Sequence, residues 1–139
     1  MHSITLKTRI KAAKADLYPY FHDFEKFGEL HPLMKKVTKT GTKTFYVNES
    51  VLLLGFIPMK PEYSVEVVEN GGTIIYNSHV RKGVDLQIRF SFSEHGDGYT
   101  TITEQVDVTA IAVIARILLY TIKKAHTDIF RALERLIKP

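Results

Sequence analysis

The segment AIAVIARILLYTIKKAHTDIFRALERLIK, residues 110–138, decides the fold. When successive residues are placed at 100° steps, its apolar side chains fall within a stripe about 100° wide, which is typical of an amphipathic helix. The stripe contains Ile111, Ile114, Ala115, Leu118, Ile122, Ala125, Ile129, Ala132, Leu133 and Leu136, and the opposite side carries Arg116, Lys123, Thr127, Arg131 and Glu134. One helix of about 28 residues is roughly 42 Å long, which is enough to cross a whole domain.

Upstream of this helix the sequence predicts strands. Between residues 42 and 108, stretches typical of strands are separated by short turns, and connections this short join antiparallel neighbours. The five strands expected there are Lys43–Leu52, Met59–Glu69, Thr73–Arg81, Val84–Ser93 and Tyr99–Val108. Another strand is expected near the N-terminus, where Ile4, Leu6, Thr8 and Ile10 alternate with polar residues.

The stretch from Lys14 to about Lys36 changes to helical spacing. It stops near His31-Pro32, because proline disfavours helix in the residue before it, and one kinked helix or two short helices fit. A six-stranded sheet with one apolar face needs a cover, and the long helix has one stripe to bury. We therefore expect a single α+β domain over residues 1–139, with a curved six-stranded antiparallel sheet wrapped around the C-terminal helix.

Two short sequences connect this arrangement with a known family. FEKFGELHP, residues 24–32, ends the helical segment, and GVDL, residues 83–86, opens the fifth strand. Together with the order of elements, they make the chain resemble the START-like, or SRPBCC, superfamily, which includes lipid-transfer domains, pollen-allergen-type proteins and polyketide cyclases. The resemblance implies a helix-grip fold whose cavity receives an apolar or aromatic ligand of lipid-, polyketide- or isoprenoid-like character, with catalysis in only some branches.

Composition narrows the possible chemistry. The chain has no cysteine, which excludes disulfides, a thiolate nucleophile and a cysteine-based zinc site. Its net charge of +4 comes from 19 basic and 15 acidic residues with the two signs interspersed, so a nucleic-acid partner is not expected. No secretory signal is recognisable, and the longest apolar stretch, Val108 to Ile122, is too short to span a bilayer. We expect a cytoplasmic protein that has no integral membrane segment and uses neither a metal nor another cofactor.

Two glutamates occupy positions where an apolar face is expected. Glu104 lies between Ile102 and Val106, and Glu49 lies between two valines, so each carboxylate points inward if the apolar face of its strand does. An ionised carboxylate in such a place needs a donor nearby or has a raised pKa. Either glutamate is therefore a candidate anchor for a ligand, or a candidate general acid or base. The alternative is that both lie near strand ends, where water reaches them.

The third catalytic candidate, His79, depends on the register of the hairpin around Lys82-Gly83. A two-residue turn pairs His79 with Leu86 and directs its side chain inward. A three-residue turn instead pairs Tyr76 with Ile88 and directs His79 into solvent. The sequence leaves both registers open.

The leading functional hypothesis is a domain that binds or carries a small apolar molecule. The residues expected to form the binding site are Phe27, His31, Phe45, Val47, Glu49, Tyr63, Val65, Leu86, Ile88, Phe90, Glu104, Leu118 and Ile122. For His31, capping of the preceding helix is an alternative role. A second hypothesis is a cyclase- or dehydratase-like enzyme that uses a buried Glu or His as its acid or base.

A third hypothesis is a protein-interaction domain. The loop Leu52–Met59 is more apolar than a solvated turn requires, and exposed apolar patches usually mark a partner. The loop is therefore a candidate for a homodimer contact, for a membrane contact or for a gate at the cavity mouth. The alternative is structural, with the loop simply extending two strands.

Overall fold

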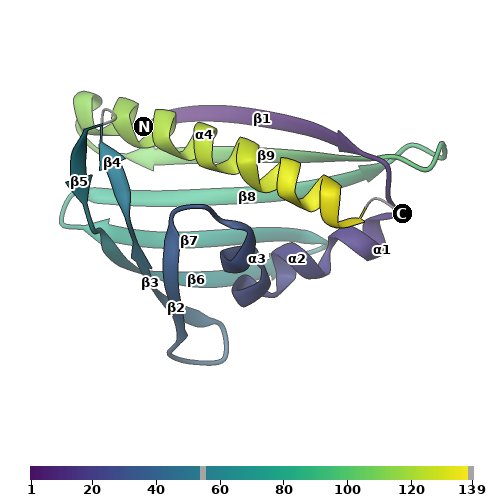
Figure 1. The fold of residues 1–139 in the computed structure, drawn as a ribbon, viewed down its shortest axis with the longest axis horizontal. Coiled ribbons are helices and arrows are strands. Elements are labelled where there is room, and N and C mark those ends of the chain that lie inside the picture. The colour runs from purple at the N-terminus through teal and green to yellow at the C-terminus, as the bar shows by residue number, and fades with distance from the viewer. Residues whose placement is uncertain (54–55, 138–139) are drawn as a thin grey trace.

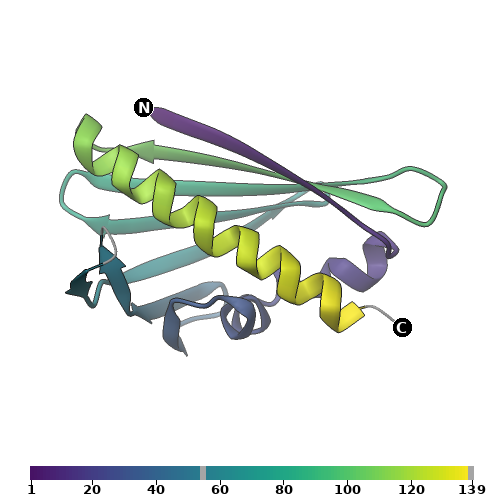
Figure 2. The ribbon, with the colours of Figure 1, turned by 45° about the horizontal axis from the view of Figure 1, so that its top comes forward.

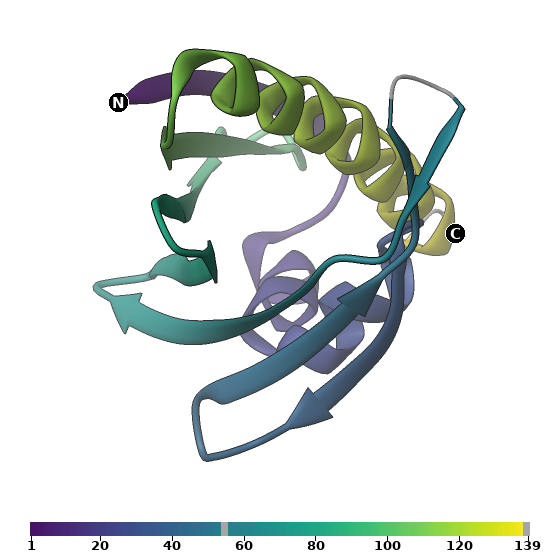
Figure 3. The same cartoon turned by 90° about the vertical axis from the view of Figure 1, so that its left-hand side faces the viewer.

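The computed structural model describes residues 1–53 and 56–137. Its main element is a seven-stranded antiparallel sheet with the strand order β1-β9-β8-β7-β6-β3-β2. Figure 3 shows this sheet bent into a trough, with the long helix α4 lying along the open side. Strands β4 and β5 form a separate two-stranded sheet. The fold is the expected α+β helix grip.

Figure 1 labels the elements in chain order. They are β1 (His2–Ile10), α1 (Lys14–Leu17), α2 (Pro19–His22), α3 (Phe24–Leu30), β2 (Met34–Lys39), β3 (Thr44–Glu49), β4 (Val51–Leu53), β5 (Ile57–Met59), β6 (Glu62–Asn70), β7 (Thr73–Arg81), β8 (Val84–Glu94), β9 (Thr100–Thr109) and α4 (Ala112–Ile137). The short helices α1 to α3 lie at one end of the trough, below the C-terminal half of α4.

The main sheet has one more strand than the sequence predicts. Residues up to about Lys36 were expected to belong to the helical segment, but Met34–Lys39 forms the edge strand β2, which pairs with β3. Helix α3 ends at Leu30 because His31 precedes a proline and adopts an extended backbone conformation. The β-branched residues Val37 and Thr38 then favour a strand.

Two of the predicted strands are each divided. The predicted strand Lys43–Leu52 contains β3 and the first two residues of β4, and Met59–Glu69 contains the last residue of β5 and most of β6. Pro61 lies at the second break, where it has no N–H to donate and its carbonyl accepts from the N–H of Glu49 at 3.0 Å. The helical segment is also more divided than expected, since Pro19 begins α2 after α1 has ended.

The strand nearest the N-terminus lies beside the strand that leads into α4. β1 pairs with β9 along its whole length, from His2 opposite Val108 to Ile10 opposite Thr100. The hydroxyl of Ser3 donates to Asp107 Oδ1 at 2.6 Å across this pair. Figure 2 shows β1 at the edge of the sheet next to the beginning of α4.

Aromatic side chains from α2 and α3 fill one end of the trough. Phe21, Phe24 and Phe27 are at most 1% exposed, and they pack against Tyr76 and Phe90 of the sheet. The hydroxyl of Tyr76 donates to the carbonyl oxygen of Phe21 at 2.6 Å, which satisfies a polar group inside this aromatic cluster. The cluster ties the short helices to the sheet.

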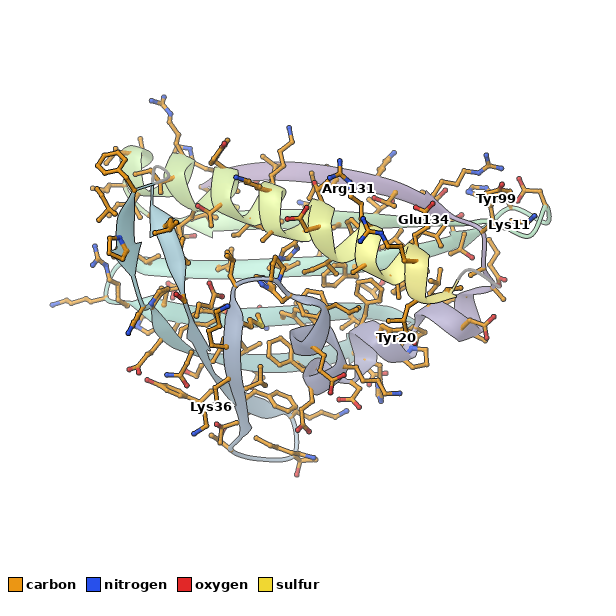
Figure 4. All side chains as sticks on the ribbon, in the orientation of Figure 1. Lys11, Tyr20, Lys36, Tyr99, Arg131 and Glu134 are labelled. Atoms are coloured by element: carbon orange, nitrogen blue, oxygen red, sulfur yellow. The ribbon has the colours of Figure 1, made fainter. Side chains whose placement is uncertain are left out.

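Helix α4 has the two faces that its sequence predicts. Ala115, Ile129 and Leu133 are buried against the rest of the domain. Figure 4 shows Arg131 and Glu134 on the side of the helix that faces away from the sheet, and both are exposed. The C-terminal half of α4 therefore covers the aromatic core, while the N-terminal half extends past it.

Candidate functional site

A cavity of about 390 Å³ lies between the sheet and the N-terminal half of α4. Its inner end is closed by Phe24, Phe27 and Tyr76 of the aromatic cluster. The walls are mostly apolar and include Val65, Val84, Leu86, Ile88, Ile114, Ile117, Leu118, Ile122 and Ala125. The cavity exists because the aromatic cluster fills only one end of the trough, and the helix roofs the remaining space.

A buried carboxylate and a histidine meet next to this cavity. Glu104 on β9 is fully buried, as the alternation of its strand predicts, and His126 on α4 is 3% exposed. A hydrogen bond joins Glu104 Oε2 to His126 Nδ1. Among the described residues, Glu104 Oε1 is the only buried side-chain polar atom without a hydrogen-bond partner. His126 lines the cavity and Glu104 lies behind it.

A second histidine lies beside this pair. His31 follows α3, and its backbone N–H donates to the carbonyl of Gly28 at 3.2 Å, so it caps the helix while its side chain lines the cavity. The N–H of Leu33 donates to His31 Nδ1 at 3.2 Å. Burial, with a smaller contribution from the neighbouring His126, lowers the pKa of His31 well below its usual value, so the ring is neutral at physiological pH.

The two imidazole rings pack on each other and on one phenylalanine. The ring centroids of His31 and His126 are 5.4 Å apart and the ring planes are almost perpendicular, at 88°. Phe27 packs against both rings, with centroid distances of 6.0 Å to His31 and 5.6 Å to His126. The histidines are therefore held by an apolar neighbour at the inner end of the cavity.

A tyrosine and a glutamate form a second polar pair in the cavity wall. The hydroxyl of Tyr63 on β6 donates to Glu49 Oε2 at the end of β3, and both side chains line the cavity. Burial raises the pKa of Glu49, although the hydrogen bond from Tyr63 and the nearby His126 act in the opposite direction. Burial and the adjacent carboxylate raise the pKa of Tyr63 well above its usual value. The wall of the cavity thus contains this pair and the two histidines among mainly apolar residues.

The structure brings most of the predicted site residues together around this cavity. The predicted residues that line it are Phe27, His31, Glu49, Tyr63, Val65, Leu86, Ile88, Leu118 and Ile122. Phe45, Val47 and Phe90 do not line it, because they are packed into the hydrophobic core. Glu104 reaches the cavity only through His126.

His79 is excluded from the cavity by the register of its hairpin. Tyr76 pairs with Ile88, which corresponds to the longer of the two turns considered from the sequence, and an irregularity lies between His79 and Arg81. The side chain of His79 is 64% exposed, and its Nδ1 lies 2.6 Å from Asp85 Oδ1. His79 therefore lies outside the cavity, with the outward orientation that the sequence analysis gave as its alternative.

The residue that sequence reasoning missed is His126. The apolar stripe that the sequence predicts for α4 does not include it. The available signal was Glu104, since a carboxylate on an apolar strand face requires a donor nearby. Finding that donor on α4 requires knowing which turn of the helix crosses β9.

The β4–β5 hairpin lies at the edge of the cavity, which Met59 also lines. Leu52 is 64% exposed, Phe56 is 72% exposed and Met59 is 43% exposed, so this hairpin presents apolar side chains to solvent. The predicted loop Leu52–Met59 includes residues 54–55, which lie outside the described residues. Arg81, at the end of β7, contributes a charged side chain to the cavity wall.

Two further observations concern residues 1–53 and 56–137. No group of three or more His, Asp or Glu side chains in this part of the chain is arranged to hold a metal ion. None of its helices combines the length and the apolar character needed to cross a membrane.

Comparisons with known proteins identify the fold. No family model and no curated protein matches the sequence. A START superfamily protein from Mycobacterium smegmatis has a TM-score of 0.78 at 14% identity, covering 98% of this chain and 99% of that chain. Ara h 8.0201 has a TM-score of 0.71 at 12% identity, covering 97% and 96%. The di-domain ARO/CYC BexL from the BE-7585A biosynthetic pathway has a TM-score of 0.64 at 13% identity, covering 99% of this chain and 50% of that chain. The chain therefore has the START-like helix-grip fold.

Proposed function

We propose that this protein binds a small, largely apolar molecule of lipid-, polyketide- or isoprenoid-like character in the cavity under α4. The observation that carries the proposal is the cavity itself, about 390 Å³ with mainly apolar walls. This volume falls in the range of roughly 300–1,000 Å³ that is usual for ligand pockets. Burial of an apolar ligand there removes its surface from water, which supplies the binding energy.

The few polar groups in the wall orient the ligand. His31, His126 and the Glu49–Tyr63 pair line the same cavity as the apolar residues. A small number of placed polar groups in an apolar pocket is the usual source of specificity. The ligand that fits best is an apolar molecule with one polar end, and that end lies next to the histidines.

The proposal is tested by filling the cavity. Leu118 lines it, whereas Tyr120, two residues along the same helix, is 69% exposed. Leu118→Trp should weaken binding of the fluorophore anilinonaphthalene sulfonate at least tenfold, and Tyr120→Trp should leave it unchanged. Because the chain has no tryptophan, each variant also reports the polarity around its single indole. Undiminished binding by Leu118→Trp contradicts the proposal.

Identification of the natural ligand uses the unmodified protein. Native mass spectrometry of the purified chain should reveal a retained small molecule, and the Leu118→Trp variant should retain less of it. A protein that carries no molecule and also fails to bind the fluorophore has no ligand cavity in solution.

A second candidate function is catalysis by a cyclase- or dehydratase-like mechanism. The observation that favours it is the buried pair of Glu104 and His126, since a carboxylate that orients a histidine is a common acid–base arrangement. Glu104→Gln should reduce the turnover of any substrate that the wild-type protein converts. Unchanged turnover removes Glu104 from the mechanism.

A third candidate is a homodimer formed through the β4–β5 hairpin. The exposed side chains of Leu52 and Phe56 favour it, because large apolar groups in solvent often mark a contact surface. Sedimentation velocity should then detect a dimer that Phe56→Ser dissociates. A wild-type protein that stays monomeric at all concentrations has no such contact.

A further inference from the structure

The two histidines of the cavity present opposite hydrogen-bonding atoms to it. His31 Nδ1 accepts a hydrogen bond from the N–H of Leu33, so the proton of its neutral ring is on Nε2. His126 Nδ1 faces the carboxylate of Glu104, which accepts a hydrogen bond from the Nδ1–H group. In the unprotonated base form of the ring, Nε2 therefore carries the lone pair. One ring is therefore a donor at Nε2 and the other is an acceptor at Nε2.

Both Nε2 atoms are accessible to a molecule inside the cavity. No hydrogen bond to either Nε2 is found among the described residues, where the only hydrogen bonds of these side chains are those at Nδ1. Glu104 Oε1 is the only fully buried polar side-chain atom there that lacks a partner. The two Nε2 atoms therefore retain accessible surface, and both rings line the cavity.

We propose that the cavity takes an apolar molecule that contains an enolisable carbonyl group, that His126 removes a proton from the carbon next to the carbonyl, and that His31 donates a hydrogen bond to the carbonyl oxygen. This inference rests on the proposed ligand binding, and it names the class of molecule and the reaction. It needs no oxidant, reductant or second substrate.

The proton transfer balances within the site. The C–H bond breaks, and its electron pair forms the carbon–carbon double bond of the enolate while the carbonyl electron pair moves to oxygen. The proton moves to Nε2 of His126, which becomes an imidazolium beside the carboxylate of Glu104. Return of the proton to the same carbon exchanges it with solvent, and its return to another position isomerises the molecule.

Each of the three residues has the environment that its role requires. Burial keeps the ring of His31 neutral, and a neutral imidazole N–H is an effective donor to a developing enolate oxygen. The apolar walls raise the strength of that hydrogen bond. Glu104 is a positioning residue, because it does not line the cavity and its one side-chain hydrogen bond among the described residues is to His126, whose tautomer it fixes and whose charged form it stabilises. Phe27 holds the two rings next to each other.

The tautomers are tested directly by nitrogen-15 NMR of the ring nitrogens. The protein should show His31 protonated at Nε2 and His126 protonated at Nδ1. Glu104→Gln should alter the His126 signature, since an amide side chain can present its NH₂ group to Nδ1 and move the ring proton to Nε2. A His31 ring protonated at Nδ1 alone overturns the inference, because it then has no donor for the carbonyl.

The reaction is tested by deuterium exchange into two enolisable aromatic ketones, β-tetralone and benzoylacetone, in deuterium oxide. The wild-type protein should exchange at least one of them faster than His126→Gln by about 10²-fold or more, which is the usual size of a general-base contribution. His79→Gln is the matched control, since that histidine is exposed on the other side of the sheet and should exchange like the wild type. Glu104→Gln should lose most of the exchange while still binding ketone.

The outcomes separate the two proposals. If the protein binds anilinonaphthalene sulfonate but neither ketone exchanges faster than with His126→Gln, the acid–base inference is overturned and ligand binding still stands. If the protein binds no fluorophore, the proposed function itself fails. His31→Leu should slow exchange relative to the wild type. His31→Gln keeps an N–H donor and should exchange faster than His31→Leu. Equal rates in these two variants contradict the role of His31.

Discussion

Removal of His126 alone should destabilise the protein more than removal of both members of the Glu104–His126 pair. In His126→Leu, both carboxylate oxygens of Glu104 lack a partner at a position with no solvent exposure. Removal of one member of a buried pair of ionisable groups, which leaves the other member without its partner, costs about 3–5 kcal/mol. That is a large part of the roughly 5–15 kcal/mol by which a domain of this kind is stable.

The double variant should recover most of this loss. With leucine at both positions, the new side chains pack against Ile102, Val106 and Phe27, and replacement of a buried pair by apolar residues is often neutral or stabilising by about 1–4 kcal/mol. Urea unfolding followed by circular dichroism at pH 7 measures the stability of His126→Leu, Glu104→Leu and the double variant. The reasoning is refuted if His126→Leu costs less than about 1 kcal/mol, or if the two single losses add in the double variant. A double variant about as stable as the wild type means that the pair contributes little net stability, which favours a functional reason for it.

Three further predictions concern individual residues. Because the folded-state pKa of Glu49 is raised, the stability that its protonated form contributes is present below pH 4.5 and is lost as pH rises. Glu49→Gln, which keeps an acceptor for Tyr63, should therefore raise the melting temperature at pH 7 but not at pH 4. Because the folded-state pKa of His31 is lowered, the free energy of unfolding should decrease as pH falls from 6.5, by up to about 1.4 kcal/mol per pH unit. In urea titrations, His31→Gln should lack this pH dependence. Gly28→Ala should lower stability by about 1 kcal/mol in the same assay, since its Cβ would lie 2.7 Å from Val37 Cγ2; a more stable variant contradicts this packing.

The fold could be predicted because its largest elements have strong local signals. The stripe of α4 has a helical period over more than seven turns, and the observed limits, Ala112 and Ile137, lie within two residues of the predicted ones. β2 was missed because an exposed edge strand has no apolar alternation, and its sequence MKKVTK buries none of its residues fully. Such a strand is specified by its partner β3 rather than by its own residues.

The site could be predicted only in part, for a different physical reason. The inward position of Glu104 follows from the period of its own strand. The identity of its partner does not, because Glu104 and His126 are 22 residues apart and meet only through the angle at which α4 crosses the sheet. The position of His79 likewise depends on one extra residue in a turn, which reverses the face on which the side chain lies.

The pairing of β1 with β9 constrains how the protein is made. The hydrogen bond from Ser3 to Asp107 joins residues 104 positions apart, so β1 has no partner strand until β9 has also been synthesised. During that interval β8 also has one unpaired edge. The sheet is therefore completed only after β9 has been synthesised, and chain termination before Thr100 leaves β1 and β8 with edges that are open to aggregation.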